Sequence, residues 1–458
     1  MNEQPNSIEP DQMPWWFRPW WIIGGMVALL IIAAPFAYRG YRISGLPDIG
    51  HPFDIEEFGT VDIPDAENAF VEYRLAVNSF IEISDADSED WIDALETETP
   101  WADVKPNVRK WLEDNRPTLE IWRQGTEKSN AVYHQPKDVN IMILLPVTHE
   151  FRNFARISKL EGKRLLAEGD AESAWNVHRA AFRSSRHSGM HGTIIERLVG
   201  IAIHGMVTED IATWSSHKKV DSKILELAMK DLKKDYQLTT PTSTMYKTGY
   251  FSYLNLQASS DELFEMADIP VPLGELGLFI FNEPEYSNRI FRQVFAGWLS
   301  QVDKPRFERA NRYAGRPEIF DVGPAETGFP GQLPPEELDV FFERSLIAKF
   351  MLAAVLQVET AVAREQVKQA CLMTLLASQW YKRDHGTFPE KLSDLVPKYL
   401  PEQRQDPYGK KGETIRYSID DEKAVFWSVG KNETDDGGNI ASPDLLDYGL
   451  EVKLKTED

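Results

Sequence analysis

The chain has 458 residues, of which 42% are hydrophobic and 27% charged, and these proportions exclude a wholly disordered chain, a collagen-like repeat and a polytopic membrane protein. Its single cysteine, Cys371, excludes an intrachain disulfide and any multi-cysteine zinc or iron–sulfur site. Fifty basic residues against 72 acidic ones give a net charge of −22, from which we predict no nucleic-acid partner.

The first predicted element is a membrane-spanning helix over residues 19–38, which follows a polar tail over residues 1–18. The twenty residues of this run carry no charge, and a helix of that length reaches about 30 Å, the thickness of a bilayer's hydrocarbon core. Aromatic residues suited to the two interfaces stand at both ends, namely Trp15, Trp16, Trp20, Trp21, Tyr38 and Tyr41. We predict a single-pass signal-anchor in the inner (cytoplasmic) membrane, with the lipid bilayer as a partner.

A cleaved signal peptide is the rival interpretation of this segment. Signal peptides begin with a basic stretch, whereas this leader carries three acidic residues against Arg18 alone, which favours an uncleaved anchor. Beyond the apolar run, Arg39 and Arg42 slightly outnumber Arg18, so the positive-inside rule by itself favours a cytoplasmic body. Long domains translocate regardless of such a small excess, and the orientation stays open at this point.

Downstream of the anchor, composition and apolar spacing divide the chain into five parts. The predicted parts are an extended Gly/Pro-rich linker over 39–64, an α-helical domain over 65–215, a mixed helix and loop region over 216–342, a long helix with an α+β module over 343–440, and a tail over 441–458. Gly169-Asp170 separates two helices of the domain, and the long helical pattern runs from Pro334 to His385, where Gly386 ends it. The predicted fold class is therefore mainly α.

The acidic segment 82–103 contains a partial EF-hand pattern. Asp85, Asp87 and Glu89 alternate, and Glu96 stands at the twelfth position of the loop. The sixth position, which needs glycine for a sharp turn, is Asp90. A helix capped by Ser84 or Ser88, with acidic residues in its first turn, explains the same residues.

Histidines offer a second candidate metal site. His187 and His191 are four residues apart, a spacing that places two imidazoles on one face of a helix, and His178 and Glu196 are candidate neighbours. Ordinary histidines at a helix end are the alternative.

Two further features of the helical regions admit a structural interpretation. Arg179, Arg183 and Arg186 line one helix face, so they are predicted to pair with the acidic segment 82–103 or to bind an anion. Cys371 falls at a core position of the long helix and is predicted to be packed rather than nucleophilic.

The C-terminal part carries a series of short motifs in a defined order. Two alternating runs, Ile415 to Ile419 and Val425 to Val429, predict a β-hairpin. The motifs around it are Thr387-Phe388-Pro389, a short Leu-rich helix, Asp406-Pro407-Tyr408-Gly409, Ser428-Val429-Gly430 and Asp435-Asp436-Gly437-Gly438.

This order resembles the C-terminal part of the major pseudopilins of type II secretion, over about residues 365–440. The whole chain also looks like membrane-anchored proteins of unknown function from planctomycete-like bacteria. The pseudopilin resemblance implies a body outside the cytoplasm and a calcium-binding loop, with Asp435, Asp436 and the neighbouring Asn432 as ligands. Pseudopilins carry a processing site and a glutamate inside the apolar helix, and this chain has neither.

The sequence therefore predicts a membrane-anchored envelope protein with a non-catalytic binding or scaffolding role and protein partners in the envelope. An envelope hydrolase with a carboxylate or metal site between the helical body and the C-terminal module is the alternative. An accessory part of a secretion apparatus is a third hypothesis, which depends on the resemblance alone.

Overall fold

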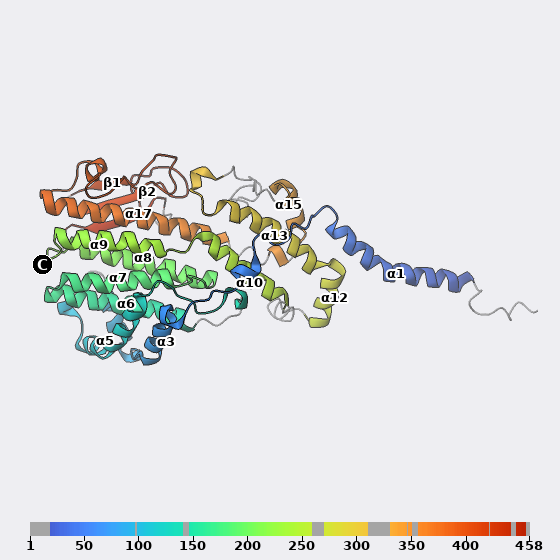
Figure 1. The fold of residues 1–458 in the computed structure, drawn as a ribbon, viewed down its shortest axis with the longest axis horizontal. Helices are drawn as coiled ribbons and strands as arrows, with labels where there is room; N and C mark the ends of the chain where they lie inside the picture. Colours follow the sequence, from blue (N-terminus) through green and yellow to red (C-terminus); the bar gives the residue numbers. More distant parts are fainter. Residues whose placement is uncertain are drawn as a thin grey trace, which may run out of the picture.

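The computed structural model describes residues 19–96, 99–140, 146–258, 270–309, 330–345, 347–349, 356–420, 422–440 and 446–454. The described chain is mainly helical with one small antiparallel sheet, so the predicted fold class is confirmed. In Figure 1 the long helices lie side by side along the body, and the sheet lies on one flank of it. A single helix projects from one end of the body.

That single helix is α1 (Pro19–Ile43), whose side chains are exposed along most of its length. It is long and apolar enough to cross a membrane, as predicted, and a signal sequence would share this property. The helix extends five residues beyond the predicted span. It therefore occupies the start of the predicted linker 39–64.

Part of the rest of that linker packs against the helices, while many of its residues stay exposed. Leu46 is buried in a core cluster, and Arg289 donates a hydrogen bond to its carbonyl oxygen. Asp48 pairs with Arg292 at 2.6 Å. Glycine and proline indicated correctly that this segment is irregular, but composition does not report which surface an irregular segment covers.

The helical body forms successive layers. Its helices are α2 (Ile55–Phe58), α3 (Phe70–Ser79), α4 (Ser88–Leu95), α5 (Pro106–Thr126), α6 (Pro146–Glu168), α7 (Ala171–His187), α8 (Ile194–Ser216) and α9 (Ser222–Asp235). Side-chain caps begin four of them: Asp54 for α2, Asp170 for α7, a Thr193–Glu196 capping box for α8, and Asp221 for α9. Short connections and these caps make α6, α7 and α8 consecutive packed neighbours.

A second apolar cluster lies between this body and α1. It is built from α10 (Thr242–Ala258), α13 (Glu283–Gln301) and α15 (Pro335–Phe342), with α12 (Val271–Phe281) beside α1. Tyr253 of α10 stacks on Phe291 of α13 with ring centres 3.5 Å apart.

The predicted continuous helix from Pro334 is interrupted, which is a further correction. Helix α15 ends at Phe342 and residues 343–345 are not helical, whereas 347–349 and α17 (Leu356–His385) are helical again. Between them, Ser345 donates a hydrogen bond to the buried carboxylate of Glu283 at 2.6 Å and accepts one from the Ala348 amide. The chain leaves helical geometry there because a polar partner far away in sequence engages it.

The predicted β-hairpin is confirmed as β1 (Arg416–Ile419) and β2 (Lys423–Ser428). A third strand, β3 (Tyr448–Lys453), pairs antiparallel with β2 inside the predicted tail 441–458, so that prediction was wrong. The sheet packs on α17, and both belong to the same apolar cluster as α3 to α9. The predicted domains 65–215 and 343–440 therefore share one core. Tertiary packing joins them, and no local signal reports it.

Candidate functional site

The loop proposed to bind calcium folds over the outer face of the sheet. Asp435 accepts hydrogen bonds from Arg416 Nε and Trp427 Nε1, both at 3.0 Å. Asp436 accepts one from Asn432 Nδ2 at 2.8 Å. Burial tends to raise the pKa of Asp435, but the bond from Trp427 and the charge of Arg416 bring it below its ordinary value.

These contacts do not fit a resident calcium ion. Calcium takes six to eight oxygen ligands, whereas the Asp435 carboxylate receives nitrogen donors and lies beside a fixed guanidinium. Among the residues that the structure describes, no group of three or more His, Cys, Asp or Glu side chains is placed to hold a metal. The calcium site stays a prediction that the geometry does not favour.

The motifs of the module meet in a polar cluster centred on Asp406, which we call the Asp406 clasp. This fully buried carboxylate accepts hydrogen bonds from the Ser428 hydroxyl at 2.5 Å, the Tyr408 amide at 2.9 Å and Arg416 at 2.7 Å. Arg416 also reaches Asp435, so the clasp connects the Asp-Pro-Tyr-Gly, Ser-x-Gly and Asp-Asp-Gly-Gly motifs. A buried charge needs such partners, and the clasp is therefore a structural device of the module.

The EF-hand interpretation of residues 85–96 is wrong. Residues Ser88 to Leu95 form α4, where a calcium loop would need an irregular backbone. The Asp87 carboxylate accepts hydrogen bonds from the Ser84 hydroxyl and from Asn107, and these bonds lower its pKa. Glu89 and Asp90 lie in the first turn of α4, as the alternative predicted, but the predicted serine cap is absent from α4.

The histidines do not form a metal site either. Helix α7 ends at His187, so His191 lies beyond it and the two imidazoles do not share a helical face. His187 is buried with its Nδ1 2.6 Å from the Tyr73 hydroxyl, while Glu196 closes the capping box of α8. Burial lowers the pKa of His187 to about 3 and that of His178 to about 4, so both are neutral core residues near neutral pH.

The arginine face of α7 pairs with different acids from those predicted. Arg179 and Arg183 both bind Asp235 of α9, not the segment 82–103. Arg186 binds Glu365 of α17 at 2.6 Å, and Arg197 of α8 binds the same carboxylate. The helical spacing correctly predicted that these arginines share one face of α7. Their acidic partners lie on α9 and α17, which only the fold brings next to α7.

Cys371 is buried in α17 as predicted, and its thiol donates to the Phe426 carbonyl oxygen at 3.3 Å. Burial raises the pKa of Cys371, as does the nearby Asp406 charge, so the thiolate is disfavoured. Like the histidines, this group is unsuited to catalysis, and the described residues give the hydrolase alternative no accessible nucleophile or base at these positions.

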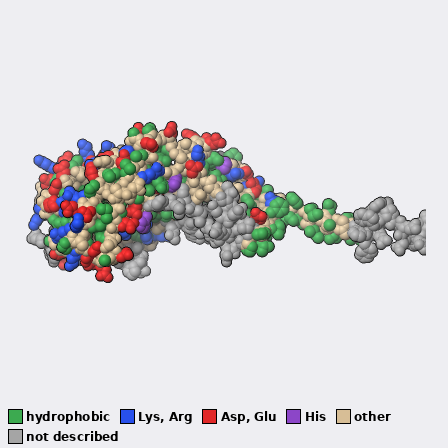
Figure 2. Space-filling model, turned by 90° about the horizontal axis from the view of Figure 1, so that it is seen from below, with side chains coloured by type: hydrophobic (Ala, Val, Ile, Leu, Met, Phe, Trp, Pro, Cys, Tyr) green, Lys and Arg blue, Asp and Glu red, His purple; other side chains and the backbone are tan. Residues whose placement is uncertain are grey.

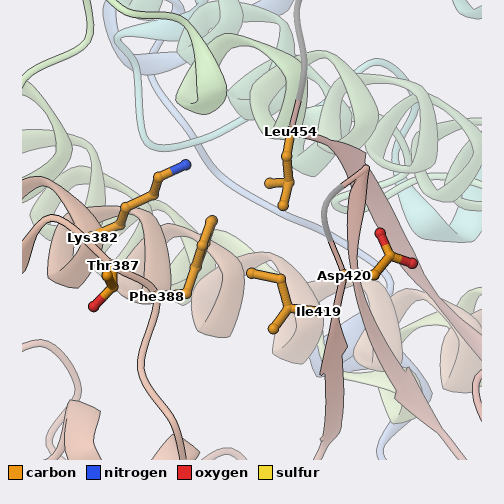
Figure 3. A pocket seen from close by; sticks show the side chains of 6 residues that line it. All are labelled: Lys382, Thr387, Phe388, Ile419, Asp420 and Leu454. Carbon is orange, nitrogen blue, oxygen red and sulfur yellow. The ribbon is translucent and has the colours of Figure 1, made fainter.

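A shallow hollow of about 530 Å³ lies where the core between α17 and the sheet opens to solvent, and we call it the terminal groove. Its lining residues are Lys382, Thr387, Phe388, Ile419, Asp420 and Leu454. Figure 3 shows Phe388, Ile419 and Leu454 facing one another, with Lys382 on one side and Asp420 on the other. Sequence reasoning missed this site.

The geometry of the sheet explains why this groove is apolar. Alternate residues of β1 face α17, so Tyr417 and Ile419 share the inward face with Phe426 and Ala424 opposite them. Ile419 is the last residue of β1, and the chain near it turns away from α17 at Gly386, which has φ +82°. Ile419 therefore keeps the orientation of a core residue but remains 40% exposed.

The two rims of the groove differ in charge. Lys382 Nζ lies 4.6 Å from the centre of the Phe388 ring, a cation–π contact that holds both side chains at the rim. The Asp420 carboxylate accepts hydrogen bonds from the Glu422 and Lys423 amides, which fix the β1–β2 turn. The alternating pattern of the hairpin sequence already indicates that Ile419 faces inward. Only the fold brings Phe388 and Leu454 next to it.

None of the protein-family models, curated proteins and solved structures compared with this chain matches it. The pseudopilin resemblance and the role that it implies therefore stay predictions.

Proposed function

We propose that this protein is a membrane-anchored binding protein of the cell envelope. In this proposal α1 anchors the chain in the cytoplasmic membrane, the body lies outside the cytoplasm, and the terminal groove binds a protein partner. The observation that carries the proposal is the position of the groove: it lies beside the C-terminal end of the described chain, at the end of the body opposite to α1 (Figure 1).

The distance between anchor and groove suits a role in presenting a binding surface. Helix α17 runs along the body, and its 30 residues measure about 45 Å at 1.5 Å per residue. A groove at its far end would stand well clear of the headgroups. The partner would approach it from the aqueous side, without competition from lipid.

The groove chemistry favours an extended peptide segment as the ligand. Its floor is apolar, Lys382 supplies a cation, and β1 is an edge strand of the described sheet. An edge strand accepts an added strand through its backbone, while side-chain pockets select residues of the incoming chain. We infer a partner segment with an apolar side chain for the floor and a carboxylate for Lys382.

A photo-crosslinking amino acid at position 419 tests the binding role in cells of the native host. We expect a discrete adduct that the Lys382→Glu substitution removes. The same photo-crosslinking amino acid at position 92 of α4, where Ile92 is 58% exposed, is the matched control and should give no such adduct. The same pattern at both positions, or no adduct at position 419, would contradict the proposal.

The orientation has its own measurement. Protease added to spheroplasts should remove a C-terminal epitope while the inner membrane stays intact. A protected epitope would place the body in the cytoplasm, and a cytoplasmic adaptor would then replace the envelope hypothesis.

A further inference from the structure

Helix α12 is unusually apolar for an exposed helix. Its eleven residues, VPLGELGLFIF, include one charge, Glu275. Four large apolar side chains are exposed: Leu273 at 66%, Leu276 at 54%, Phe279 at 41% and Phe281 at 45%. A helix that is hydrophobic around most of its surface is normally covered by protein or by lipid.

Contacts with α1 fix the position of α12. The Phe279 ring meets Phe36 of α1 edge to face at 5.5 Å, and the Phe281 ring meets Tyr38 at 6.0 Å. Arg39 of α1 donates a hydrogen bond to the Phe279 carbonyl oxygen and lies over its ring. These contacts involve the last turn of the charge-free run of α1 and the first charge after it.

This attachment sets the depth of α12 when α1 crosses a bilayer. Phe36 and Tyr38 then lie at the boundary between acyl chains and headgroups, and α12 must lie at the same level. With eleven residues, or about 16 Å, α12 is too short to cross the core. It runs across the direction of α1 rather than along it (Figure 1), which is the geometry of a helix lying in the interface.

The residues that follow α12 connect it to α13 and to α1. Asn282, in the left-handed conformation with φ 50°, ends the helix and turns the chain directly into α13. Arg42 of α1 pairs with the buried Glu283 of α13 at 3.1 Å, so α1, α12 and α13 contact one another at the same place. Figure 2 shows hydrophobic side chains that continue from α1 onto the end of the body from which it leaves.

We propose that α12 is a second membrane contact, lying in the interface of the bilayer that α1 crosses, with Leu273, Leu276, Phe279 and Phe281 inserted among lipid. The inference depends on the anchoring role of α1 in the proposed function. Lipid is the occupant because the exposed patch is continuous with the lipid-facing surface of α1. Two membrane contacts, α1 through the bilayer and α12 across its direction, would fix the tilt of the body, and so the height of the terminal groove above the membrane.

The test uses the full chain, one copy per lipid nanodisc, with Cys371→Ala and a single cysteine that carries an environment-sensitive fluorophore. The fluorophore is placed at Leu276→Cys, with Leu273→Cys as a second site on the same patch. The matched control is Leu75→Cys on α3, where the native side chain is 57% exposed and remote from α1. Two readouts are compared: reduction by aqueous dithionite and quenching by a nitroxide on the upper acyl chain of the lipid.

We expect both α12 sites to be reduced several-fold more slowly than the Leu75 site and to be quenched several-fold more strongly by the lipid nitroxide. Equal access of dithionite to all three sites would overturn the proposal. Slow reduction without lipid quenching would also overturn it, since protein and not lipid would then cover the patch. A chain that does not remain with the nanodiscs would refute the anchor itself, a failure distinct from that of α12.

Discussion

Replacing Glu365 by glutamine tests the buried charge cluster that joins α7, α8 and α17. The carboxylate is almost inaccessible and receives Arg186 at 2.6 Å and both terminal nitrogens of Arg197, which are themselves buried. His204 lies beside them, and burial lowers its pKa well below the ordinary value, so it adds no counter-charge. Glu365→Gln keeps the shape of the side chain and leaves two buried guanidiniums without their shared anion.

Two routes give a similar magnitude for the loss of stability. Burial by itself would raise the pKa of Glu365, but the charges of Arg186 and Arg197 lower it from 4.5 to about 2. At about 1.36 kcal/mol per pKa unit this corresponds to about 3 kcal/mol at neutral pH. Removing one partner of a buried ion pair typically costs about 3–5 kcal/mol, because an uncompensated charge remains. We expect the free energy of unfolding to fall by about 3 kcal/mol.

The pH dependence follows from the sign of the shift. A carboxylate whose pKa is depressed in the folded state stabilises it fully above its unfolded pKa, near 4.5. The contribution decreases as the pH falls from there towards 2. The difference between the wild type and Glu365→Gln should therefore be largest above pH 5 and fall to less than half by pH 3.

Urea unfolding of the full chain in detergent micelles, followed by tryptophan fluorescence at pH 7 and pH 3, measures both effects. The control is Asp114→Asn, which breaks the exposed pair with Lys110 and should leave the unfolding midpoint unchanged. A loss below about 1 kcal/mol at pH 7, or the same loss at both pH values, would refute the reasoning.

Three further predictions concern the C-terminal module. Asp406→Ala should destabilise the module by about 1–3 kcal/mol, because the Ser428 hydroxyl and the Tyr408 amide lose their buried acceptor while Arg416 keeps Asp435, and hydrogen exchange should accelerate in β1 and β2 but not in α6. The matched change Asp435→Ala, at a half-exposed carboxylate, should have a much smaller effect on the same exchange. The melting temperature should be the same in excess calcium and in a chelator, and a rise with calcium would show that the folded chain binds the ion. Cys371 should not react with an aromatic disulfide reagent in the folded chain at pH 8 but should react in urea, and rapid reaction of the folded protein would contradict its burial.

Local chemistry determined much of the fold. The charge-free run made the first twenty residues of α1 apolar, and Asp170 caps α7 directly after the predicted break at Gly169-Asp170. Strict alternation produced the β1–β2 hairpin, whose inward and outward faces follow from a period of two. These features depend on residues close together in the chain, so periodicity and capping suffice to predict them.

Only the tertiary structure decided which polar groups pair and which surfaces open to solvent. Arg186 and Glu365 are 179 positions apart, and the break before α17 depends on Glu283, 62 positions away from Ser345. The terminal groove is formed by the end of α17, the β1–β2 turn and the end of β3. The proposed membrane contact of α12 depends on the turn of α1 that α12 touches. Such pairings arise because burial forces every charge and every apolar face to find a partner, and the partner is chosen by the packing of whole elements.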